Sequence, residues 1–231
     1  MGSAVTDPTW RLRTTRLAVA LLLLALAGWS GDFLFGVFNK YRHIDAATYT
    51  MFWERRGWLW IHLAGGGLTI LLGLVQFLSQ WPRACNRPHR WSGRVYLYGM
   101  LIACTGATGL IATSPAPFSI RAAFAATALA WLCTALVGLV SIRRGRVMQH
   151  RRWMIRTYLV TLAPVTFRLL LHTPGIFSVL PPPPAGIAWL LWISWVLPLA
   201  LCELVWRLSD LARPLHPTTA AAVTVQPQSR M

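Results

Sequence analysis

The apolar residues of this chain are gathered into runs of about 20 residues, the length of helix that crosses a hydrocarbon core of about 30 Å. The runs are Leu17–Phe38, Gly57–Leu78, Gly93–Thr113, Ala122–Ile142, Met154–Leu171 and Ile187–Trp206. Hydrophobic residues make up 55% of the sequence and charged residues 12%, whereas a soluble domain carries about a quarter charged residues. We therefore expect an all-α fold, a polytopic transmembrane helix bundle of about six spans.

Arginine is concentrated in alternate connections between the runs. The N-terminal arm and the connections after the second and fourth runs hold Arg11, Arg13, Arg16, Arg83, Arg87, Arg90, Arg94, Arg143, Arg144, Arg146, Arg151 and Arg152. The connection after the third run has only Arg121, and the one after the fifth run has no charge. Because basic connections remain in the cytoplasm during insertion, we predict that both termini are cytoplasmic.

The formal net charge of +16 bears on the choice of partners. A nucleic acid partner would need the basic residues on one surface. Here they lie in clusters separated by apolar runs, so we expect no nucleic acid. The expected partner is the lipid bilayer, with anionic lipid headgroups at the cytoplasmic arginine clusters.

The cysteines predict neither a disulfide framework nor a zinc site, because none of them is paired as C-x-x-C: Cys85, Cys104, Cys133 and Cys202.

We expect four regions along the chain: residues 1–56 with a first span and an outer loop, a four-helix core at 57–172, a linker and last span at 173–210, and a disordered cytoplasmic tail at 211–231. The linker contains Pro181–Pro184, which cannot continue a helix.

The first run also resembles a signal peptide, with Ala-Leu-Ala at 25–27. It is longer than a signal sequence requires, so we favour a retained helix.

Two arginine-rich segments resemble each other. His89–Tyr96 reads H-R-W-S-G-R-V-Y, and His150–Tyr158 reads H-R-R-W-M-I-R-T-Y. In both segments arginine follows tryptophan by three positions and tyrosine follows it by five, and the preceding run contains Gly-Leu-Val. Parallel repeats are related by an axis along the membrane normal. We therefore predict a four-helix core built from two parallel helical-hairpin repeats. Interfacial anchoring by tryptophan and arginine is an alternative explanation of both segments.

Four histidines lie near the ends of the predicted core helices. His62 and His172 are near the outer ends of the second and fifth spans. His89 and His150 are at the cytoplasmic face, where the third and fifth spans begin. The four residues therefore form one candidate pair at each side of the membrane.

The fifth span contains Arg168 within an apolar run, where a charge costs at least about 2.5 kcal/mol unless it is paired or hydrated. Asp32 of the first span is at a similar depth and is the expected counter-ion. Residues at helical spacing in the fifth span are expected on one face: Thr157, Thr161, Pro164, Arg168 and His172.

The second span offers a matching face with His62 and Gln76. The glycines at 65–67 lie between these two residues. Their small size allows either close helix packing or the approach of a flat ligand.

The ordered combination of five motifs resembles the bacterial membrane-protein family catalogued as domain of unknown function 2306. The motifs are Ile61–Gly67, Leu72–Phe77, His89–Tyr96, His150–Tyr158 and Val165–Leu169. The resemblance extends over residues 57–172 and implies a multi-pass protein of the bacterial inner membrane. It supplies no ligand and no catalytic residue.

Three functional hypotheses follow from these residues. The first is a b-type haem electron carrier in which His62 with His172, and His89 with His150, are axial ligands, since haem iron accepts neutral imidazole. Arg168 would then lie near a haem propionate.

The second hypothesis is a transporter or binding protein for a small anionic molecule. Arg168 would bind the anion between His62 and His172, and the rest of the site would be formed by Thr161, Gln76 and Asp32. The third hypothesis is a non-catalytic scaffold or accessory subunit. No catalytic residue is predicted, because the sequence has no G-x-S-x-G, P-loop or H-E-x-x-H motif and only six acidic residues.

Overall fold

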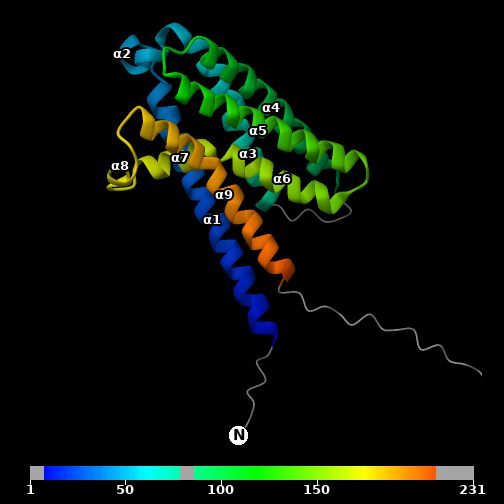
Figure 1. Ribbon diagram of the computed structural model, residues 1–231. Coiled ribbons are helices and arrows are strands. Elements are labelled where there is room, and N and C mark those ends of the chain that lie inside the picture. The colour runs from blue at the N-terminus through cyan, green and yellow to red at the C-terminus, as the bar shows by residue number, and fades with distance from the viewer. Residues whose placement is uncertain (1–7, 79–85, 212–231) are drawn as a thin grey trace, which may run out of the picture. The chain divides into compact units, whose positions relative to one another are not determined.

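The computed structural model describes residues 8–78 and 86–211, and it describes the side chains of residues 17–77 and 87–211. This part of the chain forms helices joined by turns and short loops (Figure 1). The helices are α1 (Pro8–Tyr41), α2 (Ala46–Tyr49), the 3-10 helix η1 (Thr50–Arg55), α3 (Arg56–Leu78), α4 (Asn86–Ala112), α5 (Phe118–Arg143), α6 (Val147–Thr161), α7 (Ala163–Leu171), α8 (Ile176–Val179) and α9 (Ala185–Leu211).

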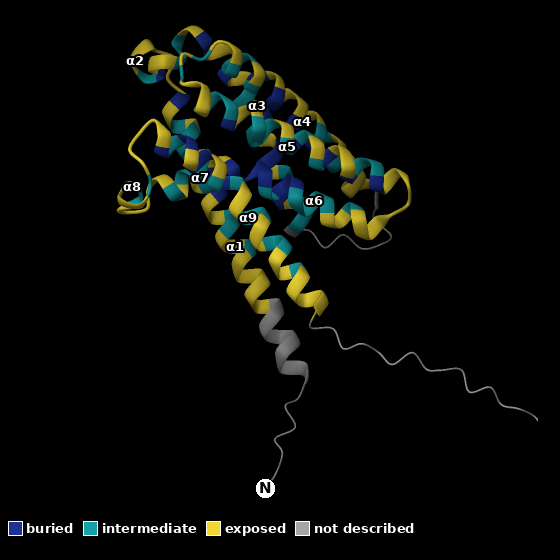
Figure 2. Cartoon of the chain, in the orientation of Figure 1, coloured by how far each residue is buried: buried dark blue, intermediate teal, exposed yellow. Residues whose placement is uncertain are grey.

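The core is made by α3, α4, α5 and α6, which lie side by side in Figure 1. Helix α3 packs along α4, and α5 packs along α6, so each pair is an antiparallel hairpin. The two hairpins meet through α4 with α5 and through α3 with α6. Buried residues gather where these four helices face one another (Figure 2). The predicted four-helix core of two hairpins is therefore confirmed.

The hairpin arrangement brings the start of α4 and the end of α5 to the same end of the core. We call this the Arg-rich end, because it holds Arg87, Arg90, Arg94, Arg143, Arg144 and Arg146.

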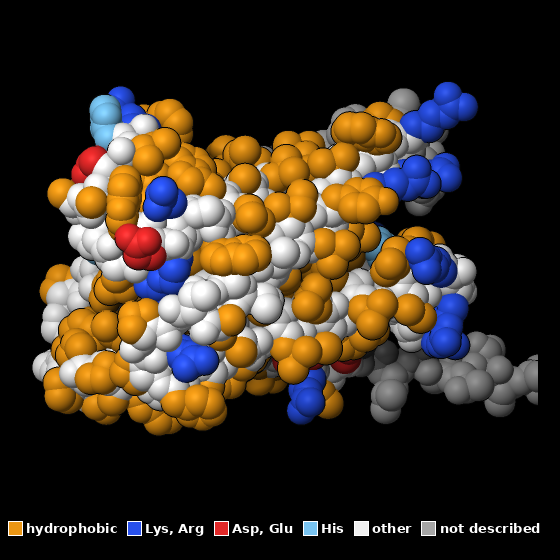
Figure 3. All heavy atoms as spheres, turned by 90° about the horizontal axis from the view of Figure 1, so that it is seen from above, with side chains coloured by type: hydrophobic (Ala, Val, Ile, Leu, Met, Phe, Trp, Pro, Cys, Tyr) orange, Lys and Arg blue, Asp and Glu red, His pale blue; other side chains and the backbone are white. Residues whose placement is uncertain are grey.

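Among the residues that the structure describes, five helices are long and apolar enough to cross a membrane, and α6 with α7 adds a sixth span if the bent pair is counted as one. Large apolar side chains face outward on these helices: Leu22 is 68% exposed and Leu129 is 62% exposed. Hydrophobic side chains also cover much of the face seen in Figure 3. In water so much exposed apolar surface is unfavourable, whereas in lipid it is the expected surface. The prediction of about six transmembrane helices is confirmed.

The predicted fifth span is not one straight helix. α6 ends at Thr161 and α7 begins at Ala163, and the two helices are bent by 43° relative to each other. Pro164 lies in the first turn of α7, where its missing N–H is tolerated. The single face expected from Thr157 to His172 is therefore divided: Thr157 is buried in the bundle, whereas His172 is exposed.

Helices α4 and α6 begin several residues before the predicted spans, so His89 and His150 lie inside the first turns of helices.

The short helices α2, η1 and α8 were not expected from the apolar runs. Asp45 caps α2 by accepting a hydrogen bond of 2.8 Å from the Thr48 N–H, and this bond holds the pKa of the Asp45 carboxyl below its ordinary value. Pro181–Pro184 separates α8 from α9.

Helix α1 packs against α3 and α7. The first part of α9 packs against the core, where Trp195 and Leu199 contact a buried cluster around Met100 and Trp131. The chain divides into two compact units, residues 1–199 and 200–231, and the described part of the second unit consists of the last turns of α9. The expected four regions remain a prediction, and the tail after Leu211 lies outside the described residues.

Candidate functional site

Three helices of the core meet at the hydroxyl of Thr161. The Trp131 Nε1–H of α5 donates to Thr161 Oγ1 at 2.8 Å, and the Tyr96 hydroxyl of α4 lies 2.6 Å from the same oxygen. Thr161 itself donates to the Thr157 carbonyl at 3.0 Å. A hydroxyl has one donor and two acceptor sites, so the hydrogen-bonding capacity of Thr161 is used inside the bundle. This junction lies directly before the bend between α6 and α7.

Tyr158 occupies the position in the second repeat that Tyr96 occupies in the first. Its hydroxyl donates to the Ile70 carbonyl of α3 at 3.2 Å, and its ring fills the space beside Gly73. Each tyrosine therefore extends from its own hairpin into the other. The sequence contained the signal, because both tyrosines follow tryptophan by five positions, but it did not show what the tyrosines contact.

Gln76, His89 and His150 come together at the Arg-rich end. The Gln76 side-chain amide donates to the His89 carbonyl at 2.9 Å and to Ser92 Oγ at 2.7 Å. His89 and His150 lie in the first turns of α4 and α6, which belong to different hairpins. The Nδ1–H of His150 donates to the Gly138 carbonyl at 2.8 Å, since a carbonyl only accepts. In the neutral imidazole with this tautomer, Nε2 carries the lone pair.

The two histidines at the opposite end have different neighbours. His62 Nδ1 donates to the Ala103 carbonyl of α4 at 3.0 Å, which places His62 in the contact between α3 and α4. His172 Nδ1 donates to the Arg168 carbonyl of its own helix at 2.7 Å. The structure thus holds each ring separately, through a backbone carbonyl in both cases.

The Arg168 guanidinium lies against α1. A Cβ atom added at Gly36 would be 2.9 Å from Arg168 Nη1, and Asp32 is one helical turn away from Gly36. Arg168 is therefore placed beside the helix that carries its expected counter-ion. The Asp32–Arg168 ion pair and the anionic-ligand site remain predictions.

The glycines beside His62 differ in their surroundings. A Cβ at Gly65 would meet the backbone of α4 at 2.5 Å from both Gly99 O and Ala103 N, whereas a Cβ at Gly66 would meet nothing within 4 Å. On α4, Gly106 in turn leaves room for the backbone of His62. Of the two uses expected for these small residues, helix packing explains Gly65.

The apolar helices, the lipid-facing surface and the hairpin core define a polytopic helical membrane protein. A family model described as "Predicted membrane protein (DUF2306)" matches residues 59–206, more than half of the chain. The chain belongs to this family, which confirms the resemblance noted from the sequence. No curated protein matches the chain, and no solved structure matches it.

Proposed function

We propose that this membrane protein binds b-type haem and transfers electrons, and that His89 and His150 would hold the haem iron at the Arg-rich end. The observation that supports this most is that two histidines at matching positions of the repeat lie at the same end of the core, in the first turns of helices from different hairpins. A ligand held between them would join the two halves of the core. Bis-histidine ligation requires two neutral imidazoles that face one metal ion.

The orientation of His150 supports a role as ligand. Histidines that bind metals almost always donate their second ring N–H to a carboxylate or a backbone carbonyl, which fixes the tautomer. His150 has this arrangement through Gly138. His62 and His172 share it through the carbonyls of Ala103 and Arg168, and we propose them as ligands of a second haem at the opposite end. A bound haem would supply an iron that accepts and releases one electron.

Two further features at the Arg-rich end suit a haem. Arg87 and Arg90 flank His89 on the first turn of α4, and guanidinium groups bind carboxylates such as haem propionates. Gln76 Oε1 is buried and has no hydrogen-bond partner among the described residues. It is an available acceptor beside the turn that carries His89.

Absorption spectroscopy of the full-length protein tests the proposal. The chain is expressed with an added haem supply and purified in detergent, and haem is counted per chain. We expect a Soret band, and a reduced spectrum typical of low-spin, six-coordinate haem. His89→Ala and His150→Ala should each remove the haem of the Arg-rich end, while His62→Ala should remove the haem of the opposite end.

His43→Ala is the matched control, because His43 is exposed in the loop between α1 and α2. It should retain the wild-type haem content. A wild-type protein without a Soret band, or equal haem in wild type and His150→Ala, would show that the proposal is wrong. The melting temperature of each variant separates loss of ligand from loss of fold.

A further inference from the structure

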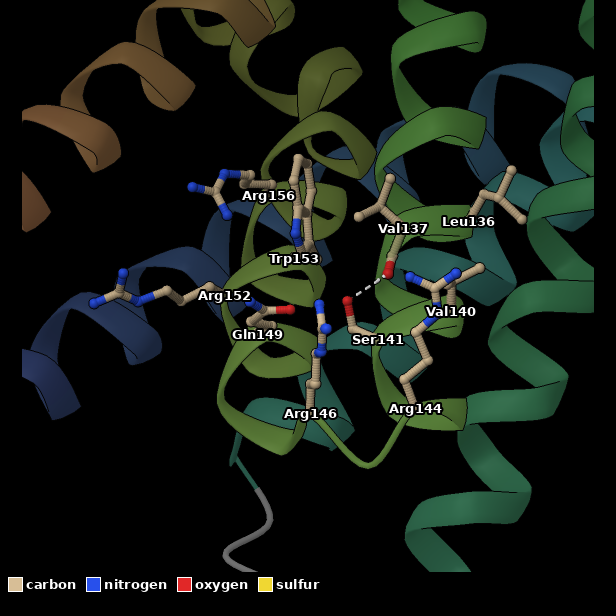
Figure 4. Close-up of a pocket in the computed structure, with 10 residues that line it drawn as sticks. All are labelled: Leu136, Val137, Val140, Ser141, Arg144, Arg146, Gln149, Arg152, Trp153 and Arg156. Atoms are coloured by element: carbon tan, nitrogen blue, oxygen red, sulfur yellow. Dashed lines mark hydrogen bonds between the residues drawn. The ribbon is translucent and has the colours of Figure 1, made fainter.

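A cavity of about 470 Å³ opens between α5 and α6 at the Arg-rich end (Figure 4). Its mouth is basic and its wall on α5 is apolar, while the wall on α6 is formed by Arg152, Trp153 and Arg156. Arg144 and Arg146 extend from the turn that joins the helices, with Gln149 beside them, and Leu136, Val137 and Val140 form the wall on α5. This division of charge matches an amphiphile.

The turn holds the two arginines at the mouth of the cavity. Gly145 has a positive φ of 71°, and the N–H groups of Gly145 and Arg146 donate to the carbonyls of Ile142 and Ser141 at 3.0 and 2.9 Å. This pattern of bonds is a Schellman motif, in which a left-handed residue ends the helix and satisfies its last carbonyls. Arg144 and Arg146 therefore flank a turn with defined geometry.

The same turn collects positive charge at the start of α6. A helix N-terminus carries partial positive charge and favours acidic residues, yet the first turn of α6 contains none and Arg146 precedes it. Charges of one sign at this point repel one another, and a bound anion would relieve that repulsion.

The hydroxyl group of Ser141, which lies in the α5 wall, is not available to a ligand in the cavity. The Ser141 hydroxyl donates to the Val137 carbonyl of its own helix at 2.7 Å, as the dashed line in Figure 4 shows. Leu136 is 60% exposed and Val137 is 38% exposed. Their side chains offer an apolar track that leads from the arginines toward the middle of the span.

We propose that this cavity binds one anionic phospholipid. Its phosphate is held by the guanidinium groups of Arg144 and Arg146, which match phosphate oxygens in pairs, and an acyl chain lies along Leu136, Val137 and Val140. The site uses neither His89 nor His150, so the proposal is independent of haem binding.

Native mass spectrometry of the delipidated full-length protein tests the site. Phosphatidylglycerol and phosphatidylcholine with identical acyl chains are added in turn. We expect one phosphatidylglycerol to bind in preference to phosphatidylcholine. The double variant R144Q/R146Q should weaken that binding at least about tenfold, because it removes both charge-assisted contacts. The double variant R143Q/R151Q removes the same charge from exposed positions that do not line the cavity, and it should change the affinity less than about twofold.

Three outcomes would overturn the proposal. Equal weakening by the two double variants would indicate general attraction to charge, and equal binding of the two lipids would exclude recognition of the headgroup charge. Displacement of the phosphatidylglycerol by inorganic phosphate at equal concentration would indicate a site for free anions. If R144Q/R146Q does not fold, R144K/R146K keeps the charge and should still weaken binding, since lysine lacks the paired donors.

Discussion

Thr161 shows how a single hydroxyl organises this bundle. It accepts the Trp131 N–H and the Tyr96 hydroxyl, and it donates to the Thr157 carbonyl. All of these groups lie in an apolar interior, where an unpaired polar group is costly. The junction therefore favours one register of α4, α5 and α6 over others that would leave donors unpaired.

Replacement of Thr161 by valine should destabilise the protein by about 1–2 kcal/mol, because the Trp131 N–H and the Tyr96 hydroxyl lose their shared partner. The matched control is Thr127→Val. Thr127 is half-buried in α5 and donates to the Ala123 carbonyl of its own helix, so its loss should cost much less. Chemical unfolding in detergent, followed by circular dichroism, measures the free energy of unfolding of both variants. Equal destabilisation of the two variants would contradict the role given to the junction.

The contact between α3 and α4 is set by small residues. Gly65 meets the backbone of Gly99 and Ala103, and Gly106 meets the backbone of His62. Close approach of two backbones through small residues is a common way for helices to associate in lipid, where apolar side chains gain little by leaving the solvent. The rotation of α3 about its axis, and with it the direction of His62, follows from this contact.

Gly65→Ala should separate α3 from α4 and destabilise the protein by about 1–3 kcal/mol, as overpacking of a close contact does. Gly66→Ala is the neighbouring control. A Cβ there meets nothing within 4 Å, and alanine is a better helix former by about 1 kcal/mol, so stability should be unchanged or slightly higher. The stabilities of the Gly65→Ala and Gly66→Ala variants are compared by their melting temperatures in detergent. A Gly66→Ala variant as unstable as Gly65→Ala would argue against packing as the role of Gly65.

The helices and hairpins were predictable, but the bend in the fifth span was not. Hydropathy reports the length of an apolar run, and the repeated Trp–Arg–Tyr spacing indicated the pairing of hairpins. The angle of the bend at Leu162 is not contained in a linear pattern, although Pro164, which has no N–H to donate, marked the place. The partners of His62 and His172 could not be predicted either, because ring direction depends on helix rotation. The pairing of His89 with His150 that the repeat suggested stays a prediction.

At the scale of the whole molecule, the charge pattern predicts which side of the membrane each end faces. The test uses a background in which Cys85, Cys104, Cys133 and Cys202 are replaced by serine. The Ser178→Cys variant places a thiol in α8, and the Arg143→Cys variant places one at the Arg-rich end; both positions are exposed. In spheroplasts, a membrane-impermeant maleimide should label the Ser178→Cys variant at once and the Arg143→Cys variant only after lysis. The reverse order would place the Arg-rich end outside.

The exchange of tyrosines between the hairpins has a consequence for how the chain is made. The space beside Gly73 in the first hairpin is filled by Tyr158 of the second, and the hydrogen-bond partners of the Tyr96 hydroxyl are Thr161 and Trp131 of the second hairpin. The ribosome completes the first hairpin well before Tyr158 and Thr161 are synthesised. During that interval the first hairpin has an empty space beside Gly73 and a Tyr96 hydroxyl without its partners from the second hairpin. We therefore expect an insertase or chaperone to protect the chain most at that stage of synthesis.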